Sequence, residues 1–330
     1  MLKTPKFWLS KNFISNLLLP LSFIYQIIFF GKKKFAKKRT VKIPVICIGN
    51  IVAGGAGKTP VAIEIGKILN SENIKFCYLV RGYKRKKTNE ILYLTNPDQM
   101  PANETGDETL LLAEISPVVV SKNRFLGYQK IFSQNKYKLI VMDDGLQNFQ
   151  IDYDLKILVV DSKIGFGNNR IMPSGPLRQS LKNIAKEIDF FVIIGEKNVL
   201  IEQEIRKLNS NAKILPATIK ANNLNQFQNQ KIYAFCGIAY PDKFFHFLAS
   251  SGIIIEKSQA FKDHHFYSEN ELNNLSKEAK ENGYTLLTTK KDWVKFPKKF
   301  QTEINFLDIN LEIENKHLIK NFINNILHEI

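Results

Sequence analysis

The chain has 330 residues and a net charge of +16, with 44% hydrophobic and 24% charged residues. This length can hold two domains with complete cores, and the composition is that of a folded chain rather than a disordered one. The positive charge predicts an anionic partner: a membrane lipid, a nucleic acid or a phosphorylated substrate. We see no zinc-finger, RNA-recognition or helix-turn-helix pattern and therefore expect no nucleic acid. Three cysteines without metal-like or redox-like spacing are typical of a reducing compartment.

A strongly apolar segment, residues 13–30, lies near the N-terminus and is followed by a basic cluster in residues 32–39. Polar residues recur along it at roughly helical spacing, so we predict a helix with one polar stripe on a mostly apolar surface. Pro20 predicts a kink in this helix. The polar stripe consists of Asn12, Asn16, Ser22 and Gln26.

Several interpretations of this helix are open. A signal peptide is disfavoured, because no small-residue cleavage site precedes the basic cluster. A spanning helix needs about 20 uninterrupted apolar residues, and this segment is interrupted; a buried amphipathic core helix is a further alternative. An interfacial helix whose basic flank contacts anionic lipid agrees best with the pattern. We therefore expect residues 1–39 to hold the protein at the cytoplasmic face of a membrane.

The most informative segment is residues 49–60, GNIVAGGAGKTP, which lies between two apolar runs. This order predicts a strand, a glycine loop and a helix, whose N-terminal N–H groups and dipole favour a bound phosphate. Val52 stands where a strict Walker A pattern has glycine, but two later glycines supply similar flexibility. Lys58 is expected to reach the outer phosphates and Thr59 to offer its hydroxyl to magnesium. The residues expected to bind a nucleoside triphosphate are Gly54, Gly55, Ala56, Gly57, Lys58, Thr59 and Pro60.

Short apolar runs alternate with helical stretches, which predicts an α/β fold with a doubly wound, mostly parallel sheet of P-loop type. In such sheets ligands bind at the carboxyl ends of the strands, where the motifs of this chain fall. A polar stretch, residues 221–231, precedes a second and smaller group of apolar runs. We expect a P-loop domain over 40–224, a second α/β domain over 225–313, and a C-terminal helix over 314–330 that could return to the first domain.

Acidic residues follow apolar runs or open helices at two places. The apolar run 139–142 is followed by Asp143 and Asp144. This order predicts either a Walker B strand whose acids hold magnesium or an ordinary turn. Two adjacent carboxylates repel each other, and a divalent cation offsets that repulsion. Asp107 and Glu108 are at the start of an apolar helix. They either interact favourably with the positive end of the helix dipole, or they act as a catalytic base and a magnesium ligand, respectively.

Two of the five histidines, His264 and His265, lie together after Asp263. Adjacent residues of a strand point to opposite sides, so we do not expect both histidines to bind one metal ion. One is expected to face a cleft, while the other packs or caps.

Two further segments carry positive charge. Residues 165–178 form a loop rich in glycine and proline, with Arg170 and Arg178, which suit a phosphate unless the segment is a simple connector. Residues 289–292, Thr-Lys-Lys-Asp, are similar to the run with which GTPases read guanine, or form a solvated turn. A GTPase also needs Asp-x-x-Gly after its second strand, and the glycine after Asp143 comes one residue too early.

Taken together, these runs resemble one family, the tetraacyldisaccharide 4'-kinases, which are the lipid A 4'-kinases of Gram-negative bacteria. The matching runs follow the family's order over nearly the whole chain. They are residues 49–50, 54–60, 81–83, 106–108, 143–147, 173–178, 237–239 and 263–265. Thr109, Asn148 and Lys290 depart from the residues usual in the family, and the last departure leaves the role of residues 289–292 open.

The resemblance implies two α/β/α domains with the active site in the cleft between them. It also implies transfer of the γ-phosphoryl group of ATP to the 4'-hydroxyl of a tetraacylated glucosamine disaccharide 1-phosphate, at the bacterial inner membrane. The expected partners are this acylated substrate and an anionic membrane surface, with the protein acting as a monomer and with ATP and Mg²⁺ required.

The resemblance also makes a functional role for the acids and histidines more probable than their local sequence does. Asp107 is expected to accept the hydroxyl proton, and His265, more than His264, to tune or orient it. Domain closure would exclude water from this site. The expected magnesium ligands, direct or through water, are Thr59, Glu108, Asp143 and Asp144. The weaker candidates for phosphate contacts are Arg81, Arg124 and Arg178.

Two other functions remain open on the sequence. A membrane-associated P-loop GTPase would use residues 289–292 and the apolar N-terminal segment, but the spacing after Asp143 opposes it. A non-catalytic lipid-binding protein with a relic glycine loop is opposed by the intact pair Lys58 and Thr59. We therefore expect an ATP-dependent lipid kinase.

Overall fold

A computed structural model describes residues 5–83, 85 and 89–328. The strands of its larger sheet are β1 (Val45–Gly49), β2 (Phe76–Val80), β3 (Leu92–Leu94), β4 (Val118–Val120), β5 (Leu139–Asp143), β6 (Leu155–Asp161), β7 (Phe190–Ile194), β8 (Lys213–Ala221) and β13 (Ile309–Ile313). The strands of its smaller sheet are β9 (Lys231–Cys236), β10 (Ile254–Ala260), β11 (Thr285–Thr289) and β12 (Asn305–Leu307). The α-helices are α1 (Phe13–Leu17), α2 (Leu19–Phe35), α3 (Lys58–Ser71), α4 (Ala102–Thr105), α5 (Asp107–Ala113), α6 (Arg124–Phe132), α7 (Leu181–Ile184), α8 (Val199–Leu208), α9 (Pro241–Ser250), α10 (Glu269–Asn282), α11 (Lys290–Trp293), α12 (Lys298–Gln301) and α13 (His317–His328).

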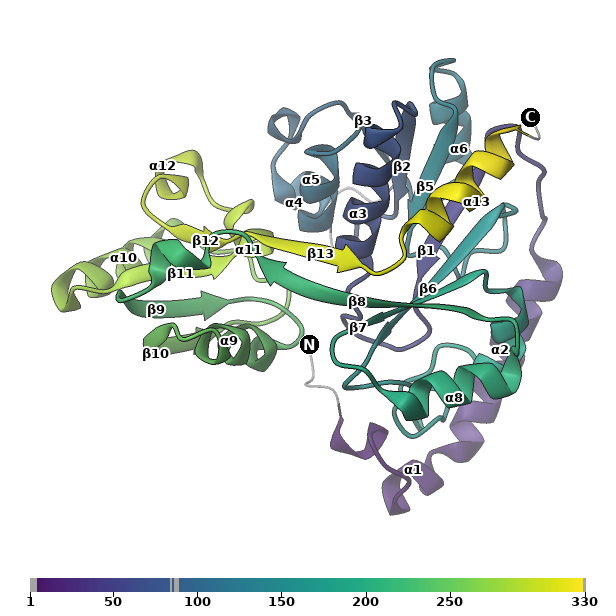
Figure 1. The fold of residues 1–330 in the computed structure, drawn as a ribbon, viewed down its shortest axis with the longest axis horizontal. Coiled ribbons are helices and arrows are strands. Elements are labelled where there is room, and N and C mark those ends of the chain that lie inside the picture. Colours follow the sequence, from purple (N-terminus) through teal and green to yellow (C-terminus); the bar gives the residue numbers. More distant parts are fainter. Residues whose placement is uncertain (1–4, 84, 86–88, 329–330) are drawn as a thin grey trace.

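The larger sheet has the strand order β13-β8-β7-β6-β1-β5-β2-β4-β3, and the smaller sheet the order β10-β9-β11-β12 (Figure 1). All strands from β8 to β4 in the larger sheet are parallel, whereas the edge strands β13 and β3 run antiparallel to their neighbours. This mixed sheet confirms the predicted α/β class. We call the larger sheet with its helices the large unit, and residues 231–307 the small unit.

The central strands are buried because helices cover both faces of the larger sheet. Every residue of β1, β2, β5 and β7 is buried, as their nearly continuous apolar sequences require. The helices α3, α5 and α13 pack into the core on one face. The helices α6, α7 and α8 pack into two smaller cores that lie against other residues of the same strands. The loops at the carboxyl ends of these strands are thereby left free to form a site.

The C-terminal part returns to the large unit earlier than the sequence indicated. β13 pairs antiparallel with β8, so the expected range 225–313 for the second domain includes a strand of the larger sheet. The last helix lies on the large unit, where Ile319 and Ile323 of α13 are buried in the same core as residues of α3. The chain therefore crosses between the two units twice, after β8 and before β13 (Figure 1).

The apolar N-terminal segment forms two helices and not one kinked helix. α1 ends at Leu17 and α2 begins at Leu19, with Pro20 in the first turn of α2, where its missing N–H costs no helical hydrogen bond. The predicted polar stripe faces the protein at Ser22, whose Oγ donates a hydrogen bond of 2.8 Å to the carbonyl of Ile171.

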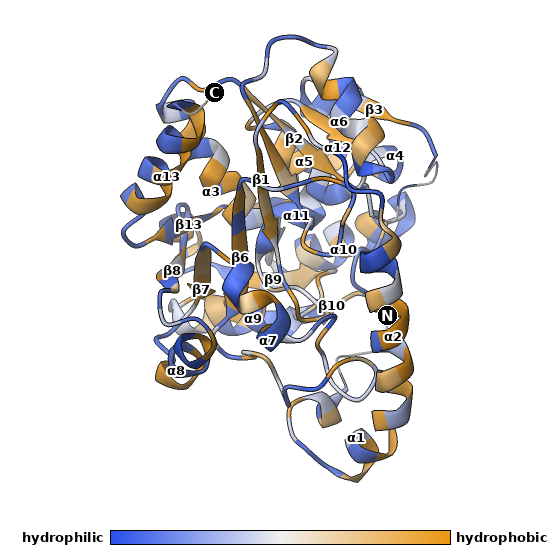
Figure 2. Cartoon of the chain, turned by 90° about the vertical axis from the view of Figure 1, so that its right-hand side faces the viewer, coloured by the Kyte–Doolittle hydropathy of each residue, from blue (hydrophilic) through white to orange (hydrophobic). Residues whose placement is uncertain are grey.

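The apolar side chains of these helices point away from the protein. Phe23 is 66% exposed and Ile27 is 56% exposed, and apolar residues follow one another along α2 in Figure 2. This exposure contradicts the alternative of a buried core helix. Among the described residues we find no helix with the length and apolar character needed to span a membrane.

Candidate active site

The glycine loop joins β1 to α3 at the carboxyl end of the central strand. Gly54 has φ +119° and Gly57 has φ +85°, a backbone region that side chains disfavour, so these two positions need glycine. Asn50 fixes the loop, because its amide group donates to the carbonyls of Val52 at 2.8 Å and Gly54 at 3.4 Å. Its side-chain oxygen also accepts a hydrogen bond of 3.2 Å from Nζ of Lys58. Asn50, which the sequence analysis did not assign to the site, therefore holds both the loop and its lysine.

Asp143 ends β5, which lies next to β1 in the sheet. Its Oδ2 accepts a hydrogen bond of 3.1 Å from the hydroxyl of Thr59 at the start of α3. Its Oδ1 is buried without a hydrogen-bond partner. Burial, with the nearby charge of Glu108, raises the pKa of Asp143 to about 7. A buried and unpaired carboxylate oxygen beside a threonine hydroxyl is a fitting ligand pair for Mg²⁺.

Asp144 takes a different role from its neighbour. It lies 3.6 Å from Nζ of Lys58 and 3.1 Å from Nη1 of Arg178. Burial would raise its pKa, but these two cations outweigh burial and hold the pKa of Asp144 below its usual range. Arg178 is the last residue of the loop 165–178, and its backbone N–H donates a hydrogen bond of 2.6 Å to the carbonyl of Ile51. The loop is thus tied to the glycine loop and is not a free connector.

Asp107 and His264 meet across the two units. Asp107 is the first residue of α5, and its Oδ2 lies 2.8 Å from Nδ1 of His264 in the segment after β10. The ring of Tyr83 packs edge-on against the imidazole at 5.3 Å between centroids. Burial would raise the pKa of Asp107, but Lys291 and His264 outweigh burial and hold it well below its usual range. Asp107 is therefore an ionised carboxylate with a histidine partner.

The structure reverses the expected order of preference between the two histidines. Nε2 of His265 lies 3.0 Å from Oε1 of Glu271, and its ring stacks on Phe261 at 4.9 Å between centroids. It thus packs within the small unit, while His264 faces the cleft. The two adjacent histidines have different surroundings, and His264, not the expected His265, lies beside Asp107.

The other expected site residues have less direct positions. Glu108 is ion-paired with Lys291 at 3.0 Å. Arg124 is buried and donates to the carbonyls of Ser121 at 2.7 Å and Asp143 at 3.4 Å, so it supports the end of β5. Arg81 lines the cleft.

Residues 289–292 do not form a guanine-reading site. Asp292 is fully buried and accepts hydrogen bonds from the backbone N–H of Gly237 at 2.9 Å and from the hydroxyl of Thr289 at 2.7 Å. An aspartate that reads guanine has to face a ligand, so this geometry contradicts the GTPase alternative. Lys291, which the sequence analysis left without a role, lies in the cleft.

A cavity of about 660 Å³ lies between the units. Its lining includes Gly54, Gly55 and Lys58 of the glycine loop, both aspartates after β5, and the Asp107–His264 pair. Within the described residues no cluster of three or more His, Cys, Asp or Glu side chains is arranged to hold a metal ion. Mg²⁺ needs no such cluster, because it is commonly held by one or two protein ligands together with substrate phosphates and water.

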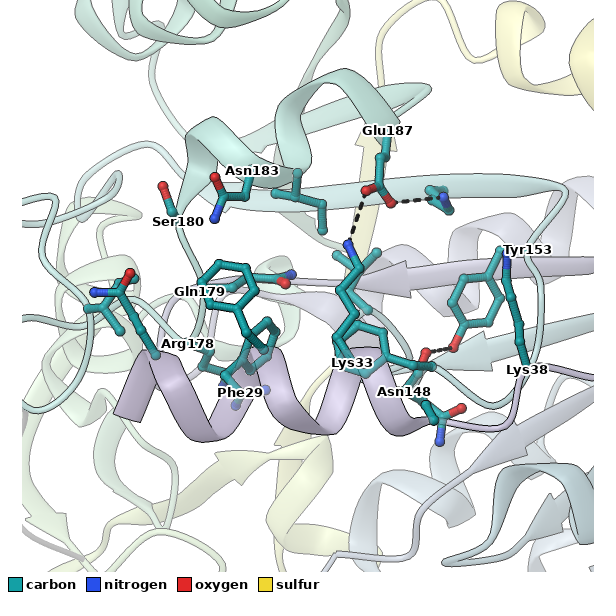
Figure 3. Close-up of a pocket in the computed structure, with 18 of the residues that line it drawn as sticks. Phe29, Lys33, Lys38, Asn148, Tyr153, Arg178, Gln179, Ser180, Asn183 and Glu187 are labelled. Atoms are coloured by element: carbon teal, nitrogen blue, oxygen red, sulfur yellow. Dashed lines mark hydrogen bonds and ion pairs between the residues drawn. The ribbon is translucent and has the colours of Figure 1, made fainter. Parts of the chain in front are cut away.

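A second cavity of about 410 Å³ lies beneath α2 (Figure 3). Phe29, Asn148 and Arg178 line both cavities, so the two adjoin. Lys33 of α2 points across this cavity to Glu187 at 3.3 Å. The second cavity therefore links the N-terminal helix to the site.

Comparison with known proteins agrees with this geometry. The family model for tetraacyldisaccharide-1-P 4'-kinase matches residues 14–328. A tetraacyldisaccharide 4'-kinase of Rickettsia canadensis is 35% identical over 320 residues, which cover 96% of this chain and 94% of that protein. The corresponding enzyme of Rhizobium meliloti is 34% identical over 294 residues, covering 89% of this chain and 84% of that protein.

A solved structure is also similar. The crystal structure of LpxK from Aquifex aeolicus in complex with ATP has a TM-score of 0.76 and 26% identity, covering 96% of this chain and all of that one. These matches span nearly the whole chain and include both units of the fold. The chain therefore belongs to the tetraacyldisaccharide-1-P 4'-kinase family and is an ATP-dependent kinase.

Proposed function

We propose that this protein transfers the γ-phosphoryl group of ATP to the 4'-hydroxyl of a tetraacylated glucosamine disaccharide 1-phosphate. The observation that supports this most strongly is that the Asp107–His264 pair faces the same cavity as Lys58 and Asp143. A phosphate-binding loop and a group able to accept a hydroxyl proton are the two ends of a phosphoryl transfer.

The nucleotide end of the site uses residues 54–60 with Lys58. The loop N–H groups and the start of α3 surround the β- and γ-phosphates, and Lys58 neutralises their charge. Its ion pair with Asp144 keeps the amine in place before ATP arrives. Arg178, on the same aspartate, adds a second cation at this end.

Thr59 and Asp143 are the residues that would hold Mg²⁺. The bound ion would neutralise charge on the phosphates of ATP. The protein itself contributes the rigid placement of the two ligands, since Asp143 is the last residue of β5 and Thr59 lies in the first turn of α3.

The acceptor end uses Asp107 as the base and His264 as the group that orients it. The imidazole fixes one face of the carboxylate, so the other face is aimed at the acceptor hydroxyl. Phosphoryl transfer needs little proton removal before the P–O bond of ATP breaks, and an ionised carboxylate of low pKa is sufficient to take the proton as the new bond forms.

The lipid end of the substrate is placed along α2. The cavity beneath α2 adjoins the active-site cavity and has both aromatic and basic lining residues, including Phe29 and Lys33. Acyl chains favour the aromatic side chains, and the phosphate of the acceptor favours the lysines. The exposed apolar side of α1 and α2 is suited to the interfacial layer of a membrane, with the lysines of the last turn of α2 against anionic lipid.

The test is transfer of labelled phosphate from γ-labelled ATP to a tetraacylated disaccharide 1-phosphate in mixed micelles with Mg²⁺. The wild type should form the bisphosphorylated lipid, and Asp107→Asn should keep ATP binding but lose at least about 100-fold in kcat. No product from a folded, ATP-binding wild type would contradict the proposed acceptor. Near-normal turnover by Asp107→Asn would contradict its role as base.

A further inference from the structure

The small unit contributes the polar side chains of Asp263, His264 and Lys291 to the cleft, and the last two are held by one rigid platform. Asp292 forms a fully buried ion pair with Lys295 at 2.6 Å, and it holds the N–H of Gly237. The carbonyl of Gly237 in turn accepts a hydrogen bond of 2.9 Å from the backbone N–H of His264. The short helix α11, which carries Lys291 next to Asp292, is therefore fixed relative to His264.

Lys291 reaches from this platform to the acids of the large unit. Its Nζ lies 3.0 Å from Oε1 of Glu108 and 3.9 Å from Oδ2 of Asp107. Burial opposes its charge, but Glu108 and Asp107 outweigh burial and raise the pKa of Lys291 above its usual range. The lysine is therefore a charged group inside the cleft.

Most of the positive charge around the cavity comes from the large unit, as Lys32, Lys58, Arg81, Lys122, Arg124 and Arg178. Lys58 and Arg178 lie at the glycine-loop end, and both are engaged with Asp144. Among the described residues that line the cavity, Lys291 is the only lysine or arginine from the small unit. It lies at the acceptor end, beside Asp107.

Resting on the proposed function, we propose that Lys291 is a further catalytic residue, which contacts the γ-phosphoryl group in transit from the side opposite Lys58. An acceptor hydroxyl bound to Asp107 lies within about 3 Å of the carboxylate, and the attacked phosphorus about 3 Å beyond it. The phosphoryl oxygens then come within reach of the flexible lysine chain, whose Nζ is 3.9 Å from that carboxylate.

The chemical need for such a cation is general. In phosphoryl transfer the negative charge is spread over the equatorial oxygens of the moving group, and an added cation lowers the barrier. The bond from the acceptor oxygen to phosphorus forms, the bond to the ADP oxygen breaks, and the hydroxyl proton goes to Asp107; Lys291 remains protonated throughout. Because it belongs to the small unit, it makes transfer depend on the contact between the units.

A matched control is present in the neighbouring residue. Lys290 also crosses from α11 to the large unit, where its Nζ lies 2.5 Å from Oε2 of Glu114 at the C-terminal end of α5, but it does not line the cavity. If the lysines of α11 merely held the units together, loss of either ion pair would have the same effect. If Lys291 acts on the phosphoryl group, the two variants differ.

The test compares Lys291→Ala, Lys291→Arg and Lys290→Ala with the wild type in steady-state transfer from ATP to the tetraacylated lipid. We expect Lys291→Ala to lose about 100- to 1,000-fold in kcat, with the KM values for ATP and lipid within about threefold of the wild type. Lys291→Arg should regain part of the lost kcat. The kcat of Lys290→Ala should stay within about threefold of the wild type. A loss of kcat in Lys290→Ala equal to that in Lys291→Ala, or a kcat of Lys291→Ala within threefold of the wild type, would overturn the proposal.

A second measurement separates this inference from the identity of the lipid. ADP with aluminium fluoride and Mg²⁺ imitates the phosphoryl group in transit and needs no acceptor. The wild type should bind this combination more tightly than ADP alone, and Lys291→Ala should lose at least about tenfold of that gain while its affinity for ADP is unchanged. An equal gain in both proteins would refute the role of Lys291 even if the lipid acceptor were wrong.

Discussion

Nδ1 of His264 lies 2.8 Å from Oδ2 of Asp107, although 157 residues separate the two in the sequence. The histidine comes from the small unit and the aspartate from the large one, so the pair exists only while the units are in contact. His264 adopts φ +58°, which turns its ring toward the cleft while the ring of His265 packs on Phe261. One strained residue thus decides which of two adjacent histidines reaches the base.

The two histidine variants should therefore behave differently. We expect His264→Ala to lower kcat by about 100-fold, because Asp107 loses the group that orients it, while His265→Ala changes kcat by less than about fivefold. Kinetics at saturating ATP and lipid, with thermal unfolding as the check on folding, decide between them. A larger loss in His265→Ala, at unchanged stability, would contradict this assignment.

Lys58 should be needed for turnover, and another lysine of the same helix should not. Lys58→Ala removes the amine that contacts the outer phosphates, and we expect kcat/KM for ATP to fall by at least about 100-fold. Lys67, also on α3, hydrogen-bonds to Asn310 at the surface, and Lys67→Ala should retain wild-type kinetics. Equal effects in the two variants would mean that the loss of helical charge, and not the phosphate contact, is responsible.

Asp143 should make the nucleotide-free protein less stable as the pH rises. Burial and Glu108 raise its folded-state pKa to about 7, whereas the unfolded value is about 3.9. The folded state therefore binds the proton more tightly, and the free energy of unfolding falls as the pH rises from about 4 to about 7. We expect Asp143→Asn to raise the free energy of unfolding at pH 8 by about 1–3 kcal/mol, with a smaller gain at pH 5.

Asp144 supplies the opposite control in the same experiment. Its folded-state pKa is lowered by Lys58 and Arg178 against the effect of burial, so it contributes stability above its unfolded pKa and loses it as the pH falls. Asp144→Asn should therefore lower the free energy of unfolding at pH 8. Urea unfolding in EDTA measures both variants, and a destabilised Asp143→Asn protein at pH 8 would show that its carboxylate is paired.

The exposed side of α2 should bring the protein to anionic lipid. We expect the double variant Phe23→Glu and Ile27→Glu to lose most binding to vesicles that contain anionic phospholipid, because it removes apolar contact and adds repulsion. Leu200→Glu is the matched control, since Leu200 is 76% exposed on α8, away from α2. Co-sedimentation with vesicles, at equal thermal stability, measures the effect. Unchanged binding of the double variant would contradict an interfacial role for α2.

The phosphate end of the site was largely readable from the sequence. Glycine loop, Lys58 and Thr59 are consecutive, and a run of this kind has few ways to fold between a strand and a helix. Asp143 ends an apolar run, and a parallel sheet places the carboxyl ends of its strands at one edge. Local order and strand topology were therefore sufficient to predict that these groups would meet.

For the N-terminal segment, the local sequence pattern predicted helical structure but not how the helices would be divided or oriented. The spacing of Asn12, Asn16, Ser22 and Gln26 predicted one polar stripe on one helix. In the structure Asn12 caps α1 and Asn16 is exposed, so the stripe is present only on α2, where Ser22 is buried and Gln26 lines the cavity beneath the helix. Its direction is set by the loop 165–178, which offers the carbonyl of Ile171 to Ser22. The break between α1 and α2 follows from the position of Pro20 in a first turn, which spacing alone did not distinguish from a kink.

The sequence by itself determined the α/β class, the glycine loop with its lysine, and the acid at the end of β5, because each depends on residues that are neighbours in the chain. Only the tertiary structure decided that His264 and not His265 meets Asp107, and that Lys291 enters the cleft. Both contacts join units held by separate cores, and their geometry depends on a positive φ at His264 and on the buried pair of Asp292 and Lys295. No periodicity or spacing encodes the relative placement of two units, since it results from packing between residues far apart in the chain.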